Sequence, residues 1–119
     1  MIPPPDDYVS EWTIRNYFNW GGYYERMQRG DFNLKLRKRL APAPIQQDFG
    51  QGTLTVKTSC RDKETNLEVT RTHHYESPAG EVLRRDKTTG GVYTDGRVDP
   101  KRLYHNGVLY HLRKDILDE

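Results

Sequence analysis

The sequence lacks several features on which chemistry and anchoring commonly depend. Its single cysteine, Cys60, excludes a disulfide within the chain and a zinc site built from several cysteines, and we expect this thiol to be buried. No run approaches the roughly 18 apolar residues of a membrane-spanning helix. The opening residues, Met-Ile-Pro-Pro-Pro-Asp-Asp, lack the charged and apolar regions of a signal peptide. We therefore expect a cytoplasmic protein without a membrane association.

Signatures of enzymes are also missing. The chain has no Gly-x-Ser-x-Gly elbow, no glycine-rich phosphate-binding loop and no His-Glu-x-x-His pair. His73 and His74 are neighbours in a predicted strand, and His105 and His111 fall on opposite faces of a predicted hairpin, so neither pair converges on one ion. We expect no metal site and no cofactor, and we favour a protein that is not an enzyme.

Alanine is scarce, whereas residues suited to strands are abundant. There are three alanines against ten threonines, seven valines and eight tyrosines, which favours β-structure. A chain of 119 residues suits a single domain, 1–119, although Leu, Ile, Val and Phe make up only 24 positions and predict a thin core. Residues 1–7 are rich in proline and aspartate and are expected to be disordered. Residues 41–52 are expected to form a long connection within the domain.

Alternation of apolar and polar residues predicts three strands, at Phe32–Leu40, Thr53–Cys60 and Asn66–Glu76. In the first strand, we expect Phe32, Leu34, Leu36 and Leu40 to face the core. Ser77-Pro78-Ala79-Gly80 predicts a turn, after which Glu81–Lys87 is expected to run back against residues 70–76.

Asn106-Gly107 is the preferred pair for a two-residue hairpin turn, so 102–112 is predicted to be a hairpin. Directly opposed residues share a face of the sheet. The face expected to be the core side carries Leu103, His105, Val108, Tyr110 and Leu112. The face expected to be exposed carries Arg102, Tyr104, Leu109, His111 and Arg113.

The segment Asp7–Arg29 fits two interpretations. As strands, it would place Trp12, Ile14, Phe18 and Trp20 on one face, with a hairpin turn at Gly21-Gly22; as a helix, its apolar residues would not form one stripe. We favour the strands. The predicted fold is therefore all-β, an antiparallel meander or a small open barrel. The alternative is an α+β fold with one helix within residues 7–29 packed on the sheet.

The distribution of basic residues indicates a function that the net charge of +2 does not. Alternation projects Lys35, Arg37 and Arg39 from one side of a strand, and Arg102, Tyr104, His111 and Arg113 share the exposed hairpin face. Basic and aromatic side chains on a sheet bind the phosphates and stack on the bases of unpaired nucleic acid. We therefore expect a small binding module for RNA or single-stranded DNA, with these residues in contact.

Two alternatives remain open. Tyrosine, tryptophan and arginine also anchor protein interfaces, so the chain would be a protein-interaction or inhibitor subunit, or a homodimer paired through Phe32–Leu40. The other alternative is a small metal-independent RNase built on His74, Glu76, Arg84 and Arg85. In that case a carboxylate or imidazole would take the 2′-hydroxyl proton, a second group would protonate the leaving oxygen, and arginine would stabilise the phosphorane charge.

Overall fold

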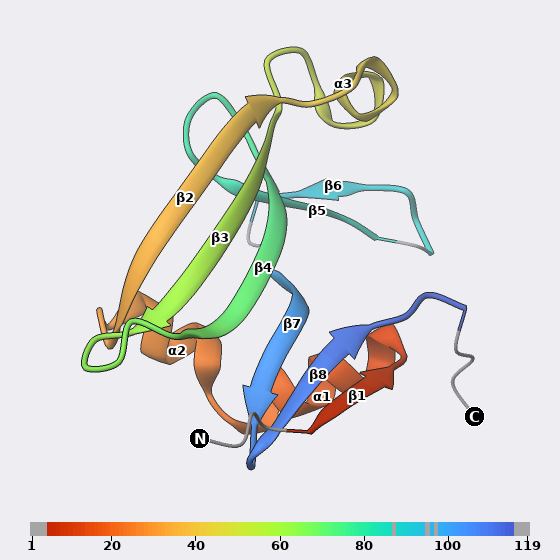
Figure 1. Cartoon of the computed structure of the whole chain (residues 1–119). Coiled ribbons are helices and arrows are strands. Elements are labelled where there is room, and N and C mark those ends of the chain that lie inside the picture. The colour runs from red at the N-terminus through yellow and green to blue at the C-terminus, as the bar shows by residue number, and fades with distance from the viewer. Residues whose placement is uncertain (1–4, 87, 95, 97, 116–119) are drawn as a thin grey trace.

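The protein is mostly β-structure with three short helices, as the computed structural model shows for residues 5–86, 88–94, 96 and 98–115 (Figure 1). In chain order the elements are β1 (Asp6–Val9), α1 (Glu11–Trp20), α2 (Tyr23–Gln28), β2 (Phe32–Leu40), α3 (Ala43–Phe49), β3 (Leu54–Asp62), β4 (Glu68–Glu76), β5 (Val82–Arg85), β6 (Val92–Tyr93), β7 (Asp99–His105) and β8 (Val108–Leu112).

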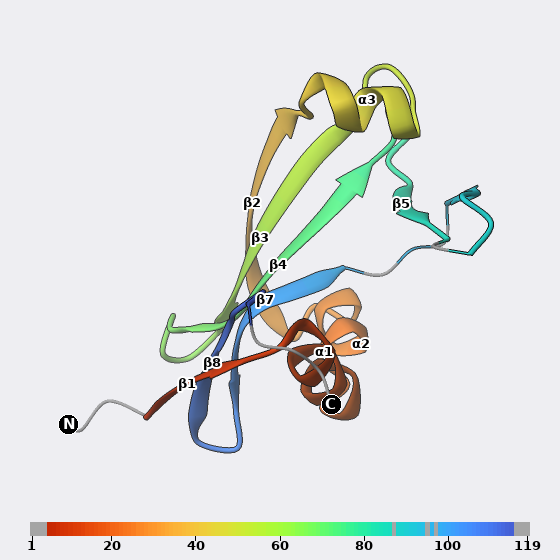
Figure 2. The same ribbon diagram turned by 90° about the vertical axis from the view of Figure 1, so that its right-hand side faces the viewer.

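The strands form one mixed, eight-stranded sheet. Its main path runs β1-β8-β7-β4-β3-β2, with all neighbours antiparallel except β1, which lies parallel to β8. The long strand β4 pairs with β7 along its first half and with β5 at its end, so β5 and β6 form an arm that diverges from β7. Figure 2 shows α1 and α2 against one face of the sheet near β7, and α3 at the far ends of β2 and β3.

The hydrophobic core lies between these two helices and the sheet. Eight buried residues form it: Ile14, Phe18, Tyr23, Met27, Phe32, Cys60, Val98 and Leu103. We call the side of the sheet that carries Cys60 and Leu103 the inner face, and the opposite side the outer face. Because α1 and α2 cover only part of the inner face, the core is small, as the composition predicts.

The strand interpretation of Asp7–Arg29 is wrong, because residues 11–28 form two helices. Ser10 caps α1 by accepting a hydrogen bond from the backbone nitrogen of Thr13 at 3.2 Å. Ile14 and Phe18, one turn apart, enter the core, whereas Trp12 and Trp20 are 61% and 73% exposed. The apolar residues form no single stripe because the two tryptophans do not contribute to the core. The α+β alternative described this segment better, although with one helix instead of two.

The two segments expected to lack regular structure contain elements. Asp6 and Asp7 belong to β1 and pair with Leu109 and Tyr110, which contradicts the expectation for that part of 1–7; residues 1–4 lie outside the described chain. The connection 41–52 contains α3, which begins after Pro42. In both segments, local composition was a poor guide because pairing with β8 and a proline-initiated turn determine the structure.

The hairpin prediction is confirmed in register and in turn. Arg102 pairs with His111 and His105 with Val108, and both turn residues have positive φ, 49° at Asn106 and 80° at Gly107. Leu103 is fully buried on the face expected to be the core side. Tyr110 and Leu112, on the same face, pack against the core, and Tyr104 and Arg113, on the other face, are exposed. Val108 and Leu109 are both half-buried, so burial does not separate the two faces near the turn.

Two other expectations are corrected. Strand β2 is where predicted, but Leu34, Leu36 and Leu40 are 43%, 50% and 64% exposed instead of facing a core, because the helices cover the inner face only near Phe32. The segment after the Ser77–Gly80 turn pairs with β4 only at Tyr75 and Glu76, since β7 occupies the earlier half of β4.

Candidate nucleic-acid interface

One row of paired residues crosses the sheet on its outer face. Successive Cα partners along this row are Lys35, Ser59, Arg71, Arg102, His111 and Tyr8. Directly opposed residues point to the same side of a sheet. The two groups of basic residues predicted from separate strands, one on β2 and one on the β7–β8 hairpin, therefore lie on a single face.

A hollow of about 860 Å³ lies on this outer face, and we call it the basic groove. Seven lysine and arginine residues line it: Lys35, Arg37, Lys57, Arg61, Arg71, Lys101 and Lys114. Its described lining holds two carboxylates, Glu68 and Asp99. Because Asp99 is already paired with Arg15 at 3.0 Å, the groove has a large excess of positive charge.

Arg37 and Lys57 illustrate this excess. They are Cα partners on adjacent strands, so two cations stand directly opposite each other. In the described part of the chain, neither forms an ion pair, and the same holds for Lys35 and Arg39. Opposed like charges destabilise a sheet, and alternating signs would serve solubility equally well. Opposed cations of this kind are typical of a surface that binds an anion.

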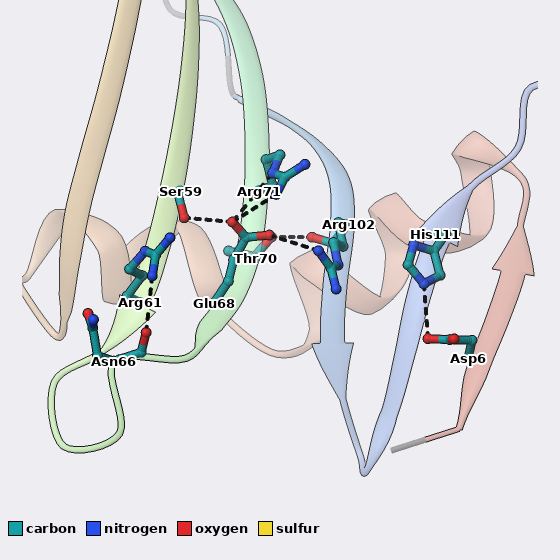
Figure 3. A network of polar contacts seen from close by, with 9 residues as sticks. All are labelled: Asp6, Ser59, Arg61, Asn66, Glu68, Thr70, Arg71, Arg102 and His111. Carbon is teal, nitrogen blue, oxygen red and sulfur yellow. Dashed lines mark hydrogen bonds and ion pairs between the residues drawn. The ribbon is translucent and has the colours of Figure 1, made fainter. Parts of the chain in front are cut away.

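Glu68, on β4, contacts arginines on the outer face of the sheet (Figure 3). Its carboxylate accepts a hydrogen bond from Ser59 Oγ at 2.6 Å and lies 3.3 Å from Arg71 Nη2 and 3.7 Å from Arg102 Nη1. Arg61, the Cα partner of Glu68, donates to the carbonyl of Asn66 at 3.3 Å. One carboxylate thus stands among three guanidinium groups and orients two of them.

His73 lies in the same groove and adds hydrogen-bonding capacity without charge at neutral pH. A 2.6 Å hydrogen bond joins its Nε2 to Thr55 Oγ1 on β3. Burial, assisted by nearby Lys101, lowers the pKa of His73 below its ordinary value of 6.5. Burial likewise lowers the pKa of Lys101. The ring of Tyr75 meets that of His73 edge-on at 4.9 Å, so an aromatic surface borders the cations.

Aromatic side chains also mark the far end of the outer face. Tyr8 and Tyr104 are 53% and 42% exposed, and His111 stacks on Tyr8 at 5.0 Å. His111 lies 3.1 Å from Asp6 (Figure 3), and Arg113 is paired with Asp115. These acids offset the positive charge there, so this end offers stacking surface more than cations.

The predicted binding residues therefore occupy different parts of one face. Lys35 and Arg37 line the basic groove, Arg39 follows them on β2, and Arg102 lies beside Glu68. Sequence reasoning missed five lining cations: Lys57, Arg61, Arg71, Lys101 and Lys114. The alternation that predicted β3 already placed Lys57 opposite the apolar positions, and that signal was sufficient to find it. Arg71 has the same alternation as Leu67, Val69 and Tyr75, so the apolar pattern of β4 did not predict its place on the outer face.

The RNase candidates are only partly brought together. His74 Nε2 lies 3.3 Å from Glu76 Oε2, but Glu76 also accepts a hydrogen bond from Lys38 at 2.9 Å, which lowers its pKa. A second hollow of about 600 Å³, at the fork between β5 and β7, is lined by His74, Arg84 and Arg85. Both arginines pair with β6 instead of β4, where we expected them.

Their charges are also engaged elsewhere. Arg84 lies over the ring of Tyr93 at 4.6 Å, and Arg85 lies 3.4 Å from Asp48. The side chain of His74 is only 9% exposed. Within the described residues, no group of three or more His, Cys, Asp or Glu side chains is placed to hold a metal ion.

The comparisons with known proteins give no family to guide the assignment. No protein family, curated protein or solved structure matches this chain. In the described chain, no helix has the length and apolarity needed to cross a membrane.

Proposed function

We propose that the protein binds RNA or single-stranded DNA along the basic groove. The observation that carries the proposal is the excess of cations on one sheet face, with Arg37 directly opposite Lys57 and no described carboxylate paired with either. Surfaces that only need to be soluble intersperse charges of both signs. A polyanion whose charges repeat at regular intervals compensates for the repulsion within such a cluster.

The spacing of the cations fits a nucleic-acid backbone. Lys35 and Arg37 are two residues apart along β2, which separates their Cα atoms by roughly 6–7 Å, close to the distance between phosphates of an extended strand. The exposed rings of Tyr8 and Tyr104, farther along the same face, offer surfaces on which unpaired bases stack. Stacking on exposed rings requires unpaired bases, which favours single strands over duplexes.

Replacement of Lys35, Arg37 and Arg39 with alanine tests this proposal. We expect weaker binding of oligonucleotides of any sequence. The slope of log affinity against log salt concentration should become shallower by about two to three units, because a variant with fewer phosphate contacts releases fewer counterions on binding. Fluorescence anisotropy over a salt series measures both quantities.

The control variant replaces Arg29, Lys63 and Arg85, three exposed cations that do not line the basic groove. It removes the same charge and is expected to bind nearly as the parent does. Equal affinities of the two variants, or no binding by the parent at low salt, would contradict the proposal.

A second candidate is metal-independent RNA cleavage, favoured by the contact of 3.3 Å between His74 and Glu76. It is less well supported, because Lys38 holds Glu76 and the His74 ring is nearly covered. Incubation of purified protein with labelled RNA, alongside a His74→Ala variant, distinguishes the two functions. Cleavage that disappears in the variant would favour the RNase.

A further inference from the structure

Strand β2 lies at a free edge of the sheet. All nine of its residues pair with β3 on one side, from Phe32 opposite Asp62 to Leu40 opposite Leu54. No other described strand pairs with β2, and Figure 1 shows it as the outermost strand at that end of the sheet. Alternate backbone N–H and C=O groups along this edge are therefore available to a further strand.

The features that usually prevent strand addition are largely absent from β2. Its register with β3 runs without a bulge, and no proline interrupts residues 32–40. Leu34, Leu36 and Leu40 leave an apolar strip exposed on the inner face. Such long, regular edges with apolar side chains recruit other strands unless charges oppose them.

The charges of β2 determine which strand it accepts. Lys35, Arg37, Lys38 and Arg39 lie in a stretch, residues 32–47, without any acidic residue. A second copy of this chain, paired antiparallel about Leu36, would place Lys35 opposite Arg37 of the other copy. Like charges in opposed positions destabilise a sheet, so self-pairing is disfavoured.

We propose that the free edge of β2 binds one extended segment of a partner protein, with acidic residues on the outer face and apolar residues on the inner face. The acidic residues would lie beside Lys35, Arg37 and Arg39, and the apolar ones beside Leu34 and Leu36. Main-chain hydrogen bonds would provide affinity, and the two faces would provide specificity, as in other cases of strand addition.

Blocked nine-residue peptides that alternate valine with glutamate or with lysine are suitable probes for the full-length protein. We expect the valine–glutamate peptide to bind and to slow amide hydrogen exchange within residues 32–40, because the free edge becomes hydrogen-bonded. The valine–lysine peptide has the same strand propensity and the wrong charge, so it should not bind. Equal binding of the two peptides, no binding of the acidic one at its solubility limit, or protection outside β2 would overturn the proposal.

A double variant, Leu34→Thr with Leu40→Thr, removes two of the three leucines of the apolar strip, neither of which lines the basic groove, and retains residues that favour strands. It should bind the valine–glutamate peptide roughly tenfold less tightly. The control, Leu67→Thr with Val92→Thr, changes two exposed apolar residues away from β2 and should bind as the parent does. Equal peptide binding by both double variants would overturn the assignment to β2.

Two further measurements distinguish partner binding at β2 from nucleic-acid binding and from self-association. Oligonucleotide affinity should be unchanged in the leucine variant, so failure of the peptide experiment does not depend on nucleic-acid binding. Sedimentation equilibrium reports self-association of the parent. A dimer that the leucine variant abolishes would show that the edge binds a second copy, and would overturn the proposal of an acidic partner.

Discussion

Arg37 of β2 and Lys57 of β3 occupy directly opposed positions on the outer face of the sheet. The sheet therefore has two cations at a position where opposite charges would stabilise it. The energetic disadvantage is small, and it has a clear consequence: a variant that removes the repulsion should be more stable and should bind a polyanion less tightly. Stability and binding are thus expected to change in opposite directions.

Lys57→Glu tests this relationship. We expect the free energy of unfolding to increase by about 0.5 kcal/mol, because an attractive cross-strand pair replaces a repulsive one. Oligonucleotide affinity should fall, because a carboxylate then lies in the basic groove. Lys63→Glu, in the turn between β3 and β4, makes the same charge change and should leave stability nearly unaltered. Chemical denaturation and anisotropy measure the two quantities, and a loss of stability in Lys57→Glu would contradict this account.

Glu68→Gln should have the opposite pair of effects. The amide oxygen can still accept the hydrogen bond from Ser59, but the charge beside Arg71 and Arg102 is lost, and we expect a loss of about 1 kcal/mol in stability. Oligonucleotides should bind more tightly at low salt, because the groove gains net positive charge. Glu64→Gln, an exposed residue of the neighbouring turn, is the matched control. Weaker binding by Glu68→Gln would instead indicate that Glu68 serves mainly to orient the arginines.

Sequence patterns anticipated the elements that depend on neighbours along the chain. The hairpin at Asn106-Gly107 follows from turn chemistry, and the alternation in Phe32–Leu40 places Lys35 and Arg37 on one face whatever lies on the other. On β4 the alternation did not indicate the outer face, because the residues that are buried are Thr70 and Thr72, whereas Arg71 has the same alternation as the apolar Leu67 and Tyr75.

Long-range pairing could not be predicted in this way. Strand β1 pairs with β8, about a hundred residues away, and β7 displaces β5 from the first half of β4. The exposure of Leu34 and Leu36 depends on where two short helices happen to end, which no local pattern encodes. For α1 the sequence does contain a start signal, because Ser10 is a typical N-cap residue and the acidic Glu11 follows it in the first turn. The two exposed tryptophans made the apolar side of this helix difficult to recognise.

Acidification should destabilise the fold before its carboxylates are titrated. Burial lowers the pKa of His73 and of His105 below 6.5 in the folded chain, so the unfolded chain takes up protons first as the pH falls. Their contribution to stability is complete above pH 6.5 and is lost progressively below it. The carboxylate of Glu76, whose pKa is lowered from 4.5, contributes only at lower pH. Between pH 7 and 5, the denaturation midpoint of the double variant His73→Gln with His105→Gln should therefore change less with pH than the midpoint of the parent.

The thiol of Cys60 should be unreactive in the native protein. The residue is fully buried, and burial together with the nearby charge of Glu68 raises its pKa to about 12. Thiolate is the reactive form, so labelling by a disulfide reagent at pH 8 should require opening of the core. The labelling rate should rise with denaturant in parallel with unfolding. Complete labelling within seconds under native conditions would show that the α2–sheet interface opens readily.

Phe18→Ala and Trp20→Ala distinguish the helical structure of residues 11–20 from the strand interpretation. In a strand, the two side chains would share a face and contribute similarly. In α1, Phe18 is 1% exposed and Trp20 is 73% exposed, so their contributions to stability differ widely. Phe18→Ala should cost about 3–5 kcal/mol through lost burial and the cavity left behind, whereas Trp20→Ala should cost less than about 1 kcal/mol. Urea denaturation followed by circular dichroism measures both, and comparable losses would contradict the helical packing.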